Sequence, residues 1–274
     1  MNVSRNHRIE VISKTLQIVE TLRDSPDGLT LRALAEQTRQ VKSSIHRILR
    51  TLAAHGYIEQ SHRGGVYRLG MQFLSVAGGV RAGLNMVELV RPFSRKLKEK
   101  FDESTYIAVL REGQAVFVDV QETHRDLRLV GPLGARVHFH ATAAGKAMAA
   151  FFPESEQQKL LHDLPQIAIT GNTVVDPERV REKWRQVHEA GYAINDEETI
   201  VGAVFIASPV FDSRGTACGS ISIGVPKPRY TDSVRLAIAA ETRECCAQAS
   251  QALLAARYSH SNAFCDDVAV GHNA

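Results

Sequence analysis

A cluster of polar and basic side chains early in the chain offers the clearest chemistry in this sequence. The segment VKSSIHRILRTLAAHGYIEQ spans residues 41–60, and its polar groups near the start are Lys42, Ser43, Ser44, His46, Arg47 and Arg50. Hydroxyls, an imidazole and three cations can donate to phosphates and to the edges of bases. They form no acid–base or nucleophile–base pair, so the segment indicates binding rather than catalysis.

Elsewhere the residue types that serve catalysis or metal binding match no known arrangement. The GKA at 145–147 lacks the first Gly and the Ser or Thr of a phosphate-binding loop, and Ser220 stands where a nucleophile elbow requires Gly. His138 and His140 would point to one side of a strand, but no carboxylate or Cys partner is evident nearby, so a strand-edge or surface role is favoured over a metal site. The acidic run 196–198 reads as a solvated turn or a helix start. We expect no catalytic residue, no metal and no cofactor.

The composition indicates a globular protein with two domains. The chain has 274 residues, 44% of them apolar and 23% charged, which is ordinary for a water-soluble fold. No apolar run reaches the roughly 18 residues of a membrane span, and the N-terminus lacks a signal-peptide core. The cysteines, which form no CxxC pair, are Cys218, Cys245, Cys246 and Cys265. We expect reduced thiols and a cytoplasmic location without membrane attachment.

Charge is distributed unevenly along the chain. Residues 1–75 hold 11 basic and 6 acidic side chains, whereas the remainder holds 22 and 24. A small basic module followed by a larger, nearly neutral one suggests that only the first meets a polyanion.

The pattern around the polar segment predicts a module of three helices and a hairpin over residues 8–70. Ser13 is placed to cap a first helix and Thr30 a short second one. The inward residues of these two helices are predicted to be Leu16, Val19, Leu22, Leu31, Leu34 and Ala35. Residues 39–41 turn the chain into the third helix, which Gly56 should end, and Gly64-Gly65 permits a tight hairpin after it.

This order of elements is that of a winged helix-turn-helix, in which the helix after the turn enters the major groove of DNA. The third helix is apolar on one face, at Ile45, Ile48, Leu49 and Leu52, and polar on the other. The side chains predicted to contact bases are Ser43, Ser44, His46 and Arg47, and those predicted to contact phosphates are Lys42 and Arg50. Arg63 at the hairpin tip would reach backbone or minor groove. The alternatives are an ordinary amphipathic surface helix and a wing used for protein contact.

The segments SKTLQIVETL, TLRALAEQT, VKSSIHRILRTLAAHGYIEQ and YRLG resemble the N-terminal domain of the isocitrate lyase regulator (IclR) family of bacterial transcription factors. The resemblance continues in HATAAGKAMAAFF and GYAINDEETIVGAVFIASPVFDSRGTACGSISIGVPKPR, and covers about residues 10–256. Two departures stand in the helix–helix turn: Arg39 replaces the usual Gly, and Val41 the frequent Pro. An Arg there would cost free energy if the turn needs a positive φ.

Residues 71–101 form the expected connector. Gly78-Gly79 interrupts an otherwise helical pattern, and Pro92 implies a kink or a second helix start. The family resemblance implies a linker helix that pairs in a homodimer or a dimer of dimers; the alternative is a passive hinge.

The second module, residues 102–256, is predicted to be α+β with an antiparallel sheet. Strand-forming runs lie at 104–112, 114–122, 203–211 and 218–225, and helical patterns at 142–152, 176–191 and 231–256. The family resemblance narrows this to a GAF-like effector-binding domain. Residues 257–274 lack periodicity, and we expect a disordered tail.

Thr142 marks a helix start that can bind an anion. As an N-cap it would leave the backbone N–H groups of Ala143, Ala144 and Gly145 pointing outward between small side chains. Lys146 either adds charge or points to solvent. The alternative is tight packing of small residues against the sheet.

The resemblance implies that this turn and a facing patch surround the effector. The facing positions are Leu129, Val137, Asn195, Phe205, Ser222 and Gly224. Asn195 stands where some members have Asp, and Phe205 where many have Cys. Phe205 takes space or offers a ring for stacking, although it can equally be a core residue.

These features together predict a transcriptional regulator that binds a double-stranded DNA operator and responds to a small, anionic metabolite. We expect the ligand to shift the populations of dimer geometries. Two alternatives remain: a constitutive DNA-binding dimer without effector, and an enzyme with an accessory winged domain.

Overall fold

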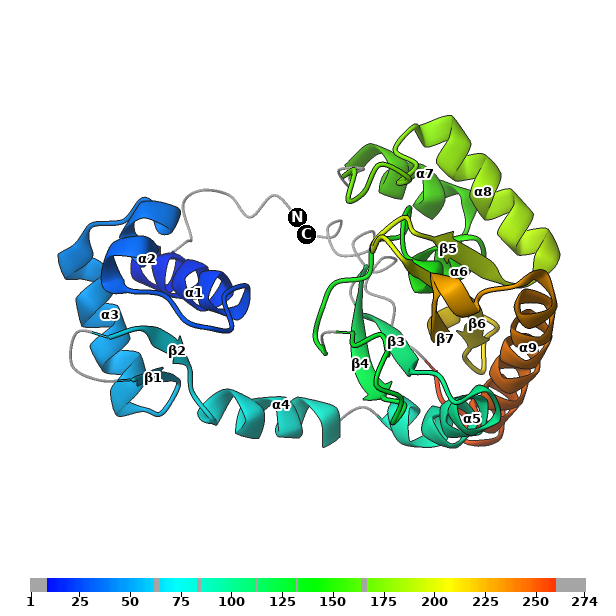
Figure 1. The fold of residues 1–274 in the computed structure, drawn as a ribbon, viewed down its shortest axis with the longest axis horizontal. Coiled ribbons are helices and arrows are strands. Elements are labelled where there is room, and N and C mark those ends of the chain that lie inside the picture. The colour runs from blue at the N-terminus through cyan, green and yellow to red at the C-terminus, as the bar shows by residue number, and fades with distance from the viewer. Residues whose placement is uncertain are drawn as a thin grey trace, which may run out of the picture. The chain divides into compact units, whose positions relative to one another are not determined.

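The protein folds into two compact units, Met1–Gly83 and Leu84–Ala274 (Figure 1). A computed structural model describes residues 9–61, 65–82, 85–111, 113–131, 133–163 and 167–259. It confirms the α+β class with an N-terminal winged helix-turn-helix and a C-terminal antiparallel sheet. No helix within these ranges is long and apolar enough to span a bilayer.

The N-terminal unit contains α1 (Glu10–Arg23), α2 (Leu31–Thr38), α3 (Lys42–Ala54), β1 (Ile58–Gln60), β2 (Tyr67–Leu69) and α4 (Gln72–Ala82). β1 and β2 pair antiparallel as the wing. One apolar cluster joins α1, α2, α3, β1 and β2, formed by Ile18, Leu22, Leu34, Ile45, Ile48, Leu49, Ile58 and Tyr67. Leu52, Leu31 and Ala35 pack against it only partly buried.

The first helix begins earlier than predicted. It starts at Glu10 after Ile9, which makes no side-chain cap, so Ser13 lies inside the helix and the predicted Ser13 cap is wrong. Burial falls on Ile18 and Leu22, whereas Leu16 is 56% exposed. The apolar residues that precede Ser13 continue the helical pattern, and a single Ser does not stop a helix whose backbone hydrogen bonds are otherwise complete.

The turn between α2 and α3 has the predicted length and an unfavourable residue. Thr30 caps α2 by accepting from the Ala33 N–H at 3.2 Å. Arg39 takes φ +54° and ψ +33°, the left-handed conformation that costs a non-glycine residue on the order of 1–2 kcal/mol. The family's usual Gly avoids this cost. After α3, Gly56 has φ +74°, as its predicted capping role requires.

The connector consists of two helices, but not with the predicted break. α4 continues through Gly78 and Gly79, and α5 (Asn85–Phe101) starts at Asn85. Pro92 lies within α5 and does not begin it. α5 packs on the sheet and on the last helix of the C-terminal unit, so this part of the predicted connector belongs with that unit.

The C-terminal unit is built on a five-stranded antiparallel sheet with strand order β4-β3-β7-β6-β5. The strands are β3 (Thr105–Arg111), β4 (Gln114–Gln121), β5 (Ala193–Asp196), β6 (Ala203–Phe211) and β7 (Ala217–Pro226). The helices are α5, α6 (Ala143–Ala149), α7 (Glu154–Asp163), α8 (Pro177–Ala190) and α9 (Asp232–Ala255), with a 3-10 turn at Lys227–Arg229. Sequence reasoning missed β5, which has only four residues, and the largely polar α7.

Both faces of this sheet are covered, which explains its long apolar strands. Ile107 and Val109 point to the cluster that includes α5 and α9, while Ala108 and Leu110 point to the cluster around α6 and α8. Side chains alternate between the faces of a strand, so a strand buried on both sides reads as a continuous apolar run. The predicted tail begins inside this fold, because the Tyr258 N–H donates to the Leu253 carbonyl and its ring packs on the core; residues 260–274 lie outside the described ranges.

Candidate nucleic-acid interface and candidate ligand pocket

The polar face of α3 is open to solvent. Its apolar face is buried at Ile45, Ile48 and Leu49. The exposed residues are Lys42, Ser43, His46, Arg47 and Arg50, and Ser44 is half-buried. The structure therefore brings six of the seven predicted DNA-contacting residues onto one helix face; Arg63 lies outside the described residues and its role stays a prediction.

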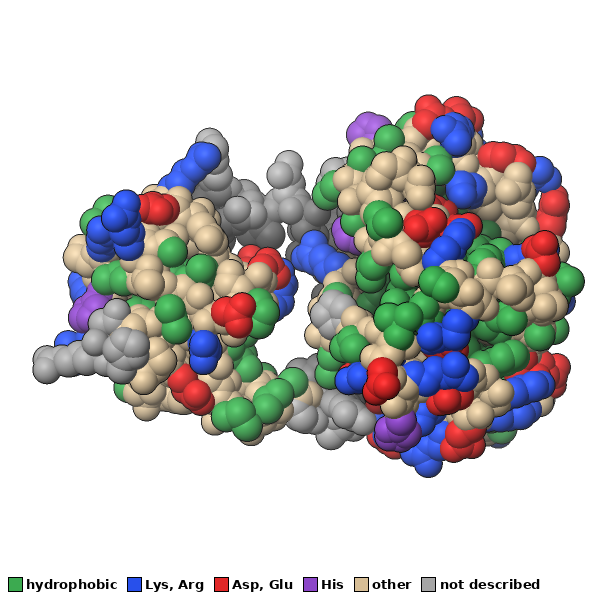
Figure 2. Space-filling view, viewed as in Figure 1, with side chains coloured by type: hydrophobic (Ala, Val, Ile, Leu, Met, Phe, Trp, Pro, Cys, Tyr) green, Lys and Arg blue, Asp and Glu red, His purple; other side chains and the backbone are tan. Residues whose placement is uncertain are grey.

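The cations of this face have no acidic partner in the described part of the chain. Within the described ranges no carboxylate pairs with Lys42, Arg47 or Arg50, whereas Arg32 on the neighbouring α2 pairs with Glu36 at 2.8 Å. Figure 2 shows a different surface on the visible side of the C-terminal unit, where basic and acidic side chains are interspersed. Unpaired cations beside a helix-turn-helix suit a polyanionic partner.

A cavity of about 220 Å³ lies in the C-terminal unit beside the start of α6. Its walls come from β3, β4, β5, β6, β7, the start of α6 and the segments before α6, before α8 and after β5. The lining residues predicted from sequence are Thr142, Ala143, Ala144, Asn195, Phe205 and Ser222. Those that sequence reasoning missed are Tyr106, Phe117, Gly131, Arg136, His138, Ile169, Thr199 and Ile200.

Four predicted positions do not line this cavity. Gly224 lies under Phe205: a side chain there would begin 2.7 Å from the Phe205 ring. Leu129 touches the same place, and its carbonyl accepts from the Tyr106 hydroxyl at 2.7 Å. Val137 lines a separate cavity of about 160 Å³, and Gly145 packs under the His138 carbonyl. Their part in ligand binding stays a prediction.

The start of α6 is capped as predicted but leaves fewer free donors than predicted. Thr142 accepts from the Gly145 N–H at 3.0 Å, so the expectation that Gly145 would bind a ligand through its N–H is wrong. The amides of Ala143 and Ala144 remain at the cavity wall. With small side chains they leave the helix start open to an anion.

Two basic side chains line the cavity where the sequence had suggested none. Arg136 is exposed and has no carboxylate partner in the described part of the chain. His138 is half-buried, and burial, then the neighbouring His140 and Arg136, hold its pKa below the ordinary 6.5. Arg136 and His138 precede the α6 cap in the sequence, and this does not indicate that they face the cavity. Only their position against β4 in the folded chain shows it.

The rest of the lining is aromatic, aliphatic and hydroxylic. Tyr106 lies edge-on to Phe117 and to Phe205, with ring centroids 6.0 and 5.9 Å apart. Burial raises the pKa of Tyr106, whose hydroxyl is engaged with Leu129. Asn195 is also engaged: its amide donates to Thr199 at 2.7 Å, and its oxygen accepts from the Glu198 N–H at 2.9 Å. Ser222 is therefore the freer of the two predicted neutral donors.

The two histidines before α6 are arranged differently from the prediction. They lie in a turn rather than on a strand, which corrects the prediction. Their ring centroids are 5.9 Å apart, and the His140 Nε2 is 3.0 Å from the Ile167 carbonyl oxygen. No cluster of three potential ligands exists among the described residues.

The acidic run after β5 is not simply solvated. Glu198 is 4% exposed, and it pairs with Lys146, which is 1% exposed. Lys146 therefore points neither to solvent nor into the cavity. The signal was present in the sequence as an unusual Lys within a helix of small residues, but its partner lies 52 residues away.

Comparison with known proteins agrees with both halves of the structure. Residues 80–251 match the family model of the IclR C-terminal domain of bacterial transcriptional regulators, and residues 11–62 match the IclR helix-turn-helix domain.

Curated relatives and solved structures extend over most of the chain. The transcriptional repressor IclR of Escherichia coli strain K12 is 31% identical over 228 residues, which are 82% of this chain and 83% of that protein. The acetate operon repressor of Salmonella typhimurium strain LT2 is 29% identical over 227 residues, 82% and 83% of the two chains. The Thermotoga maritima IclR structure has a TM-score of 0.72 at 20% identity and covers 90% of this chain and 100% of that chain. The protein belongs to the IclR family of bacterial transcriptional regulators.

Proposed function

We propose that the pocket of this transcriptional regulator binds a small organic acid, and that binding changes the affinity of α3 for an operator. The observation that carries the proposal is Arg136, a cation on the wall of an otherwise largely apolar and aromatic cavity that pairs with no carboxylate among the described residues. A carboxylate bound there would also meet the backbone amides of Ala143 and Ala144. Phe117 and Phe205 offer flat faces to the remainder of the ligand.

A structural relative supports this ligand class. An IclR homologue from Microbacterium hydrocarbonoxydans was crystallised with 4-hydroxybenzoate, a carboxylate; it has a TM-score of 0.72 with this chain at 20% identity, covering 90% and 100% of the two chains. We propose a cytoplasmic regulator that has no enzymatic activity of its own. The two rivals are a constitutive DNA-binding dimer and an enzyme, and a thermal-shift screen of organic acids separates the first from a ligand-responsive regulator.

Replacing Arg136 with Gln is expected to weaken binding of an acid found in that screen by about 10- to 100-fold, because a hydrogen bond to a charged group contributes roughly 1.5–3 kcal/mol. Ser222→Ala should weaken binding about 5-fold, because it removes one neutral hydrogen bond. Phe205→Cys should admit bulkier acids. Calorimetry measures all three. The matched control is Arg125→Gln, whose guanidinium pairs with Asp102 and should leave affinity unchanged; equal losses in both Arg variants would place the ligand elsewhere.

We further propose that the regulator acts as a homodimer held partly by α4. Met71 and Leu74 are 69% and 64% exposed at this helix, and exposed apolar side chains at the end of a small unit favour pairing with a second copy. The operator contacts of one winged module are few, so duplication raises affinity.

The fragment 1–83 is therefore expected to dimerise more strongly than the fragment 1–70, which ends before α4. Sedimentation equilibrium of the two fragments measures the difference. Leu74→Asp in the longer fragment should lower its association constant at least 10-fold, since it puts a charge into the apolar contact. Equal association of all three pieces would remove α4 from the dimer contact.

A further inference from the structure

A buried ion pair lies directly behind two walls of the ligand pocket. The Lys146 Nζ is 2.6 Å from the Glu198 Oε1, and the two side chains are 2% and 5% exposed. Lys183, with a side chain 35% exposed, reaches the same oxygen at 3.3 Å. The second carboxylate oxygen, Oε2, is buried and has no hydrogen-bond partner among the described residues. None of the three residues lines the cavity.

Each end of the pair is continuous with pocket-lining backbone. Lys146 belongs to α6, whose first turn contributes Ala143 and Ala144 to the lining. Glu198 follows β5 and immediately precedes Thr199 and Ile200, which also line the cavity. The ion pair therefore links the turn after β5 to α6, the helix that carries the proposed anion-binding amides.

Hydrogen bonds extend this attachment to a third lining segment. The Thr173 hydroxyl donates to the Glu198 carbonyl at 2.6 Å, and the Thr170 hydroxyl donates to the Glu197 carbonyl at 2.7 Å. Ile169, which is next to Thr170, lines the cavity. A shift of Glu198 would move the turn after β5 and the segment before α8 together.

A contribution to stability does not explain why this ion pair is buried. Burial lowers the pKa of Lys146 to about 8 although Glu198 opposes that shift, which means that the desolvation of the cation is not fully compensated. Buried ion pairs are commonly no more stabilising than apolar residues of the same volume. What an ion pair adds is a fixed geometry, because the ammonium must end at the carboxylate.

We propose that Lys146 and Glu198 are positioning residues of the ligand pocket, whose ion pair fixes the turn after β5 against α6 and so sets the spacing of the pocket walls. That the pocket binds a ligand rests on the proposed function, whereas the effect of the ion pair on the position of the turn does not. Neither residue touches the ligand.

Hydrogen exchange in the full chain without ligand tests the positioning directly. The reporters are the amides of Glu197, Glu198 and Ala203, bonded within the turn, and the reference is the Gly224 amide, bonded to Ser104 across the sheet. Lys146→Met and Glu198→Gln should each lower the melting temperature by about 6–15 °C, since the first leaves Glu198 with only the more exposed Lys183 and the second leaves the buried Lys146 without a carboxylate. Both should speed exchange at the turn at least 10-fold. Lys183→Met, which removes the more exposed cation, should change little.

The double variant Lys146→Met with Glu198→Leu separates positioning from simple stability. We expect it to recover most of the lost melting temperature, while exchange at the turn stays at least 10-fold faster than in the wild type and Gly224 is unchanged. Recovery of both properties would overturn the proposal, because any well-packed side chains would then serve. Unchanged exchange in the single variants would overturn it as well.

A ligand arm uses 4-hydroxybenzoate as the probe. The double variant should bind it at least 10-fold more weakly than the wild type despite its recovered melting temperature, and unchanged affinity would contradict the proposal. If the wild type does not bind the probe, the proposed ligand class is weakened, while the exchange experiment still decides whether the ion pair positions the turn.

Discussion

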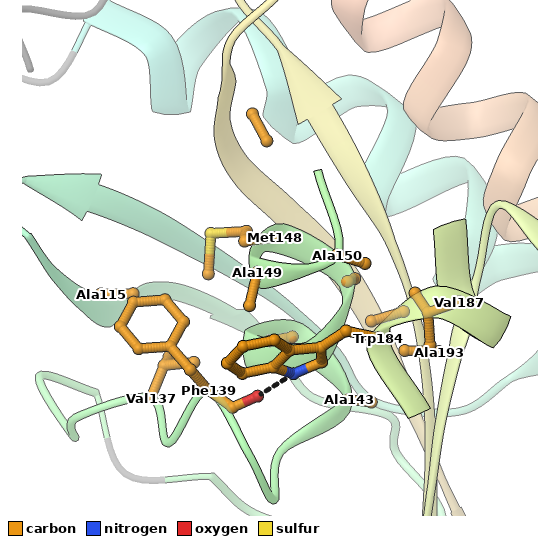
Figure 3. Packing of buried hydrophobic residues seen from close by; sticks show 14 of the residues in the cluster. Ala115, Val137, Phe139, Ala143, Met148, Ala149, Ala150, Trp184, Val187 and Ala193 are labelled. Atoms are coloured by element: carbon orange, nitrogen blue, oxygen red, sulfur yellow. Dashed lines mark hydrogen bonds between the residues drawn. The ribbon is translucent and has the colours of Figure 1, made fainter. Parts of the chain in front are cut away.

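Replacing Trp184 with Ala is expected to lower the free energy of unfolding of the C-terminal unit by about 3–5 kcal/mol. The indole is 1% exposed, and it packs from α8 against the small residues of α6 (Figure 3). Its N–H donates to the Phe139 carbonyl at 3.0 Å. The variant leaves a large cavity and an unpaired buried carbonyl, which together consume a substantial part of a typical domain's stability.

Urea unfolding followed by circular dichroism measures this effect, because the chain's single Trp is the residue removed. Trp184→Phe is the matched control: it keeps much of the ring volume and should lose only about 1–3 kcal/mol, mainly for the unsatisfied carbonyl. A loss below 1 kcal/mol in the Ala variant would show that α8 is not an integral part of this core. Under conditions in which the C-terminal unit of the Ala variant is still folded, its N-terminal unit should still bind the operator.

Replacing Arg47 with Ala is expected to weaken operator binding by about 10- to 100-fold for each half-site, because one bidentate contact to a base contributes roughly 1–3 kcal/mol. Binding to random DNA should change far less. Lys42→Ala should instead weaken operator and random DNA alike and reduce the salt dependence, since it contacts phosphate. The wild-type affinity itself should fall by about 10³-fold or more between 50 and 200 mM salt if the dimer neutralises six or more phosphates.

Fluorescence anisotropy with a labelled operator at several salt concentrations measures these quantities. Arg32→Ala is the matched control, because Arg32 is an exposed cation of the same unit but is paired with Glu36 on α2. An Arg47 variant with normal operator affinity, or with the same loss on operator and random DNA, would remove Arg47 from the residues that read bases.

The sequence alone determined those features that arise between residues a few positions apart. The apolar spacing at Ile45, Ile48 and Leu49 predicted the buried face of α3, and Thr30 and Thr142 were recognised as caps because the amides they accept from lie three residues further along the chain. The four long strands were recognisable from their apolar runs. Local signals of this kind depend only on backbone geometry, which is the same in any protein.

Local signals also failed where the context outweighed them. Ser13 is a good cap by type, yet the helix begins before it, at Glu10. Arg39 is a poor residue for a left-handed turn, yet the packing of α2 against α3 holds it there at φ +54°. At Arg39 the burial of apolar faces, which involves many residues, exceeds a preference of about 1–2 kcal/mol at one position.

Only the tertiary structure decided which side chains line the pocket. Arg136, Tyr106 and Phe117 line it because β3 and β4 form one edge of the sheet beside the start of α6. Lys146 meets Glu198 across 52 residues of intervening chain, and nothing local in either segment specifies the other. Such contacts follow from strand order and from which face of the sheet each helix covers. A buried charged side chain has lost its contact with water, so it depends on the partner that the fold places beside it.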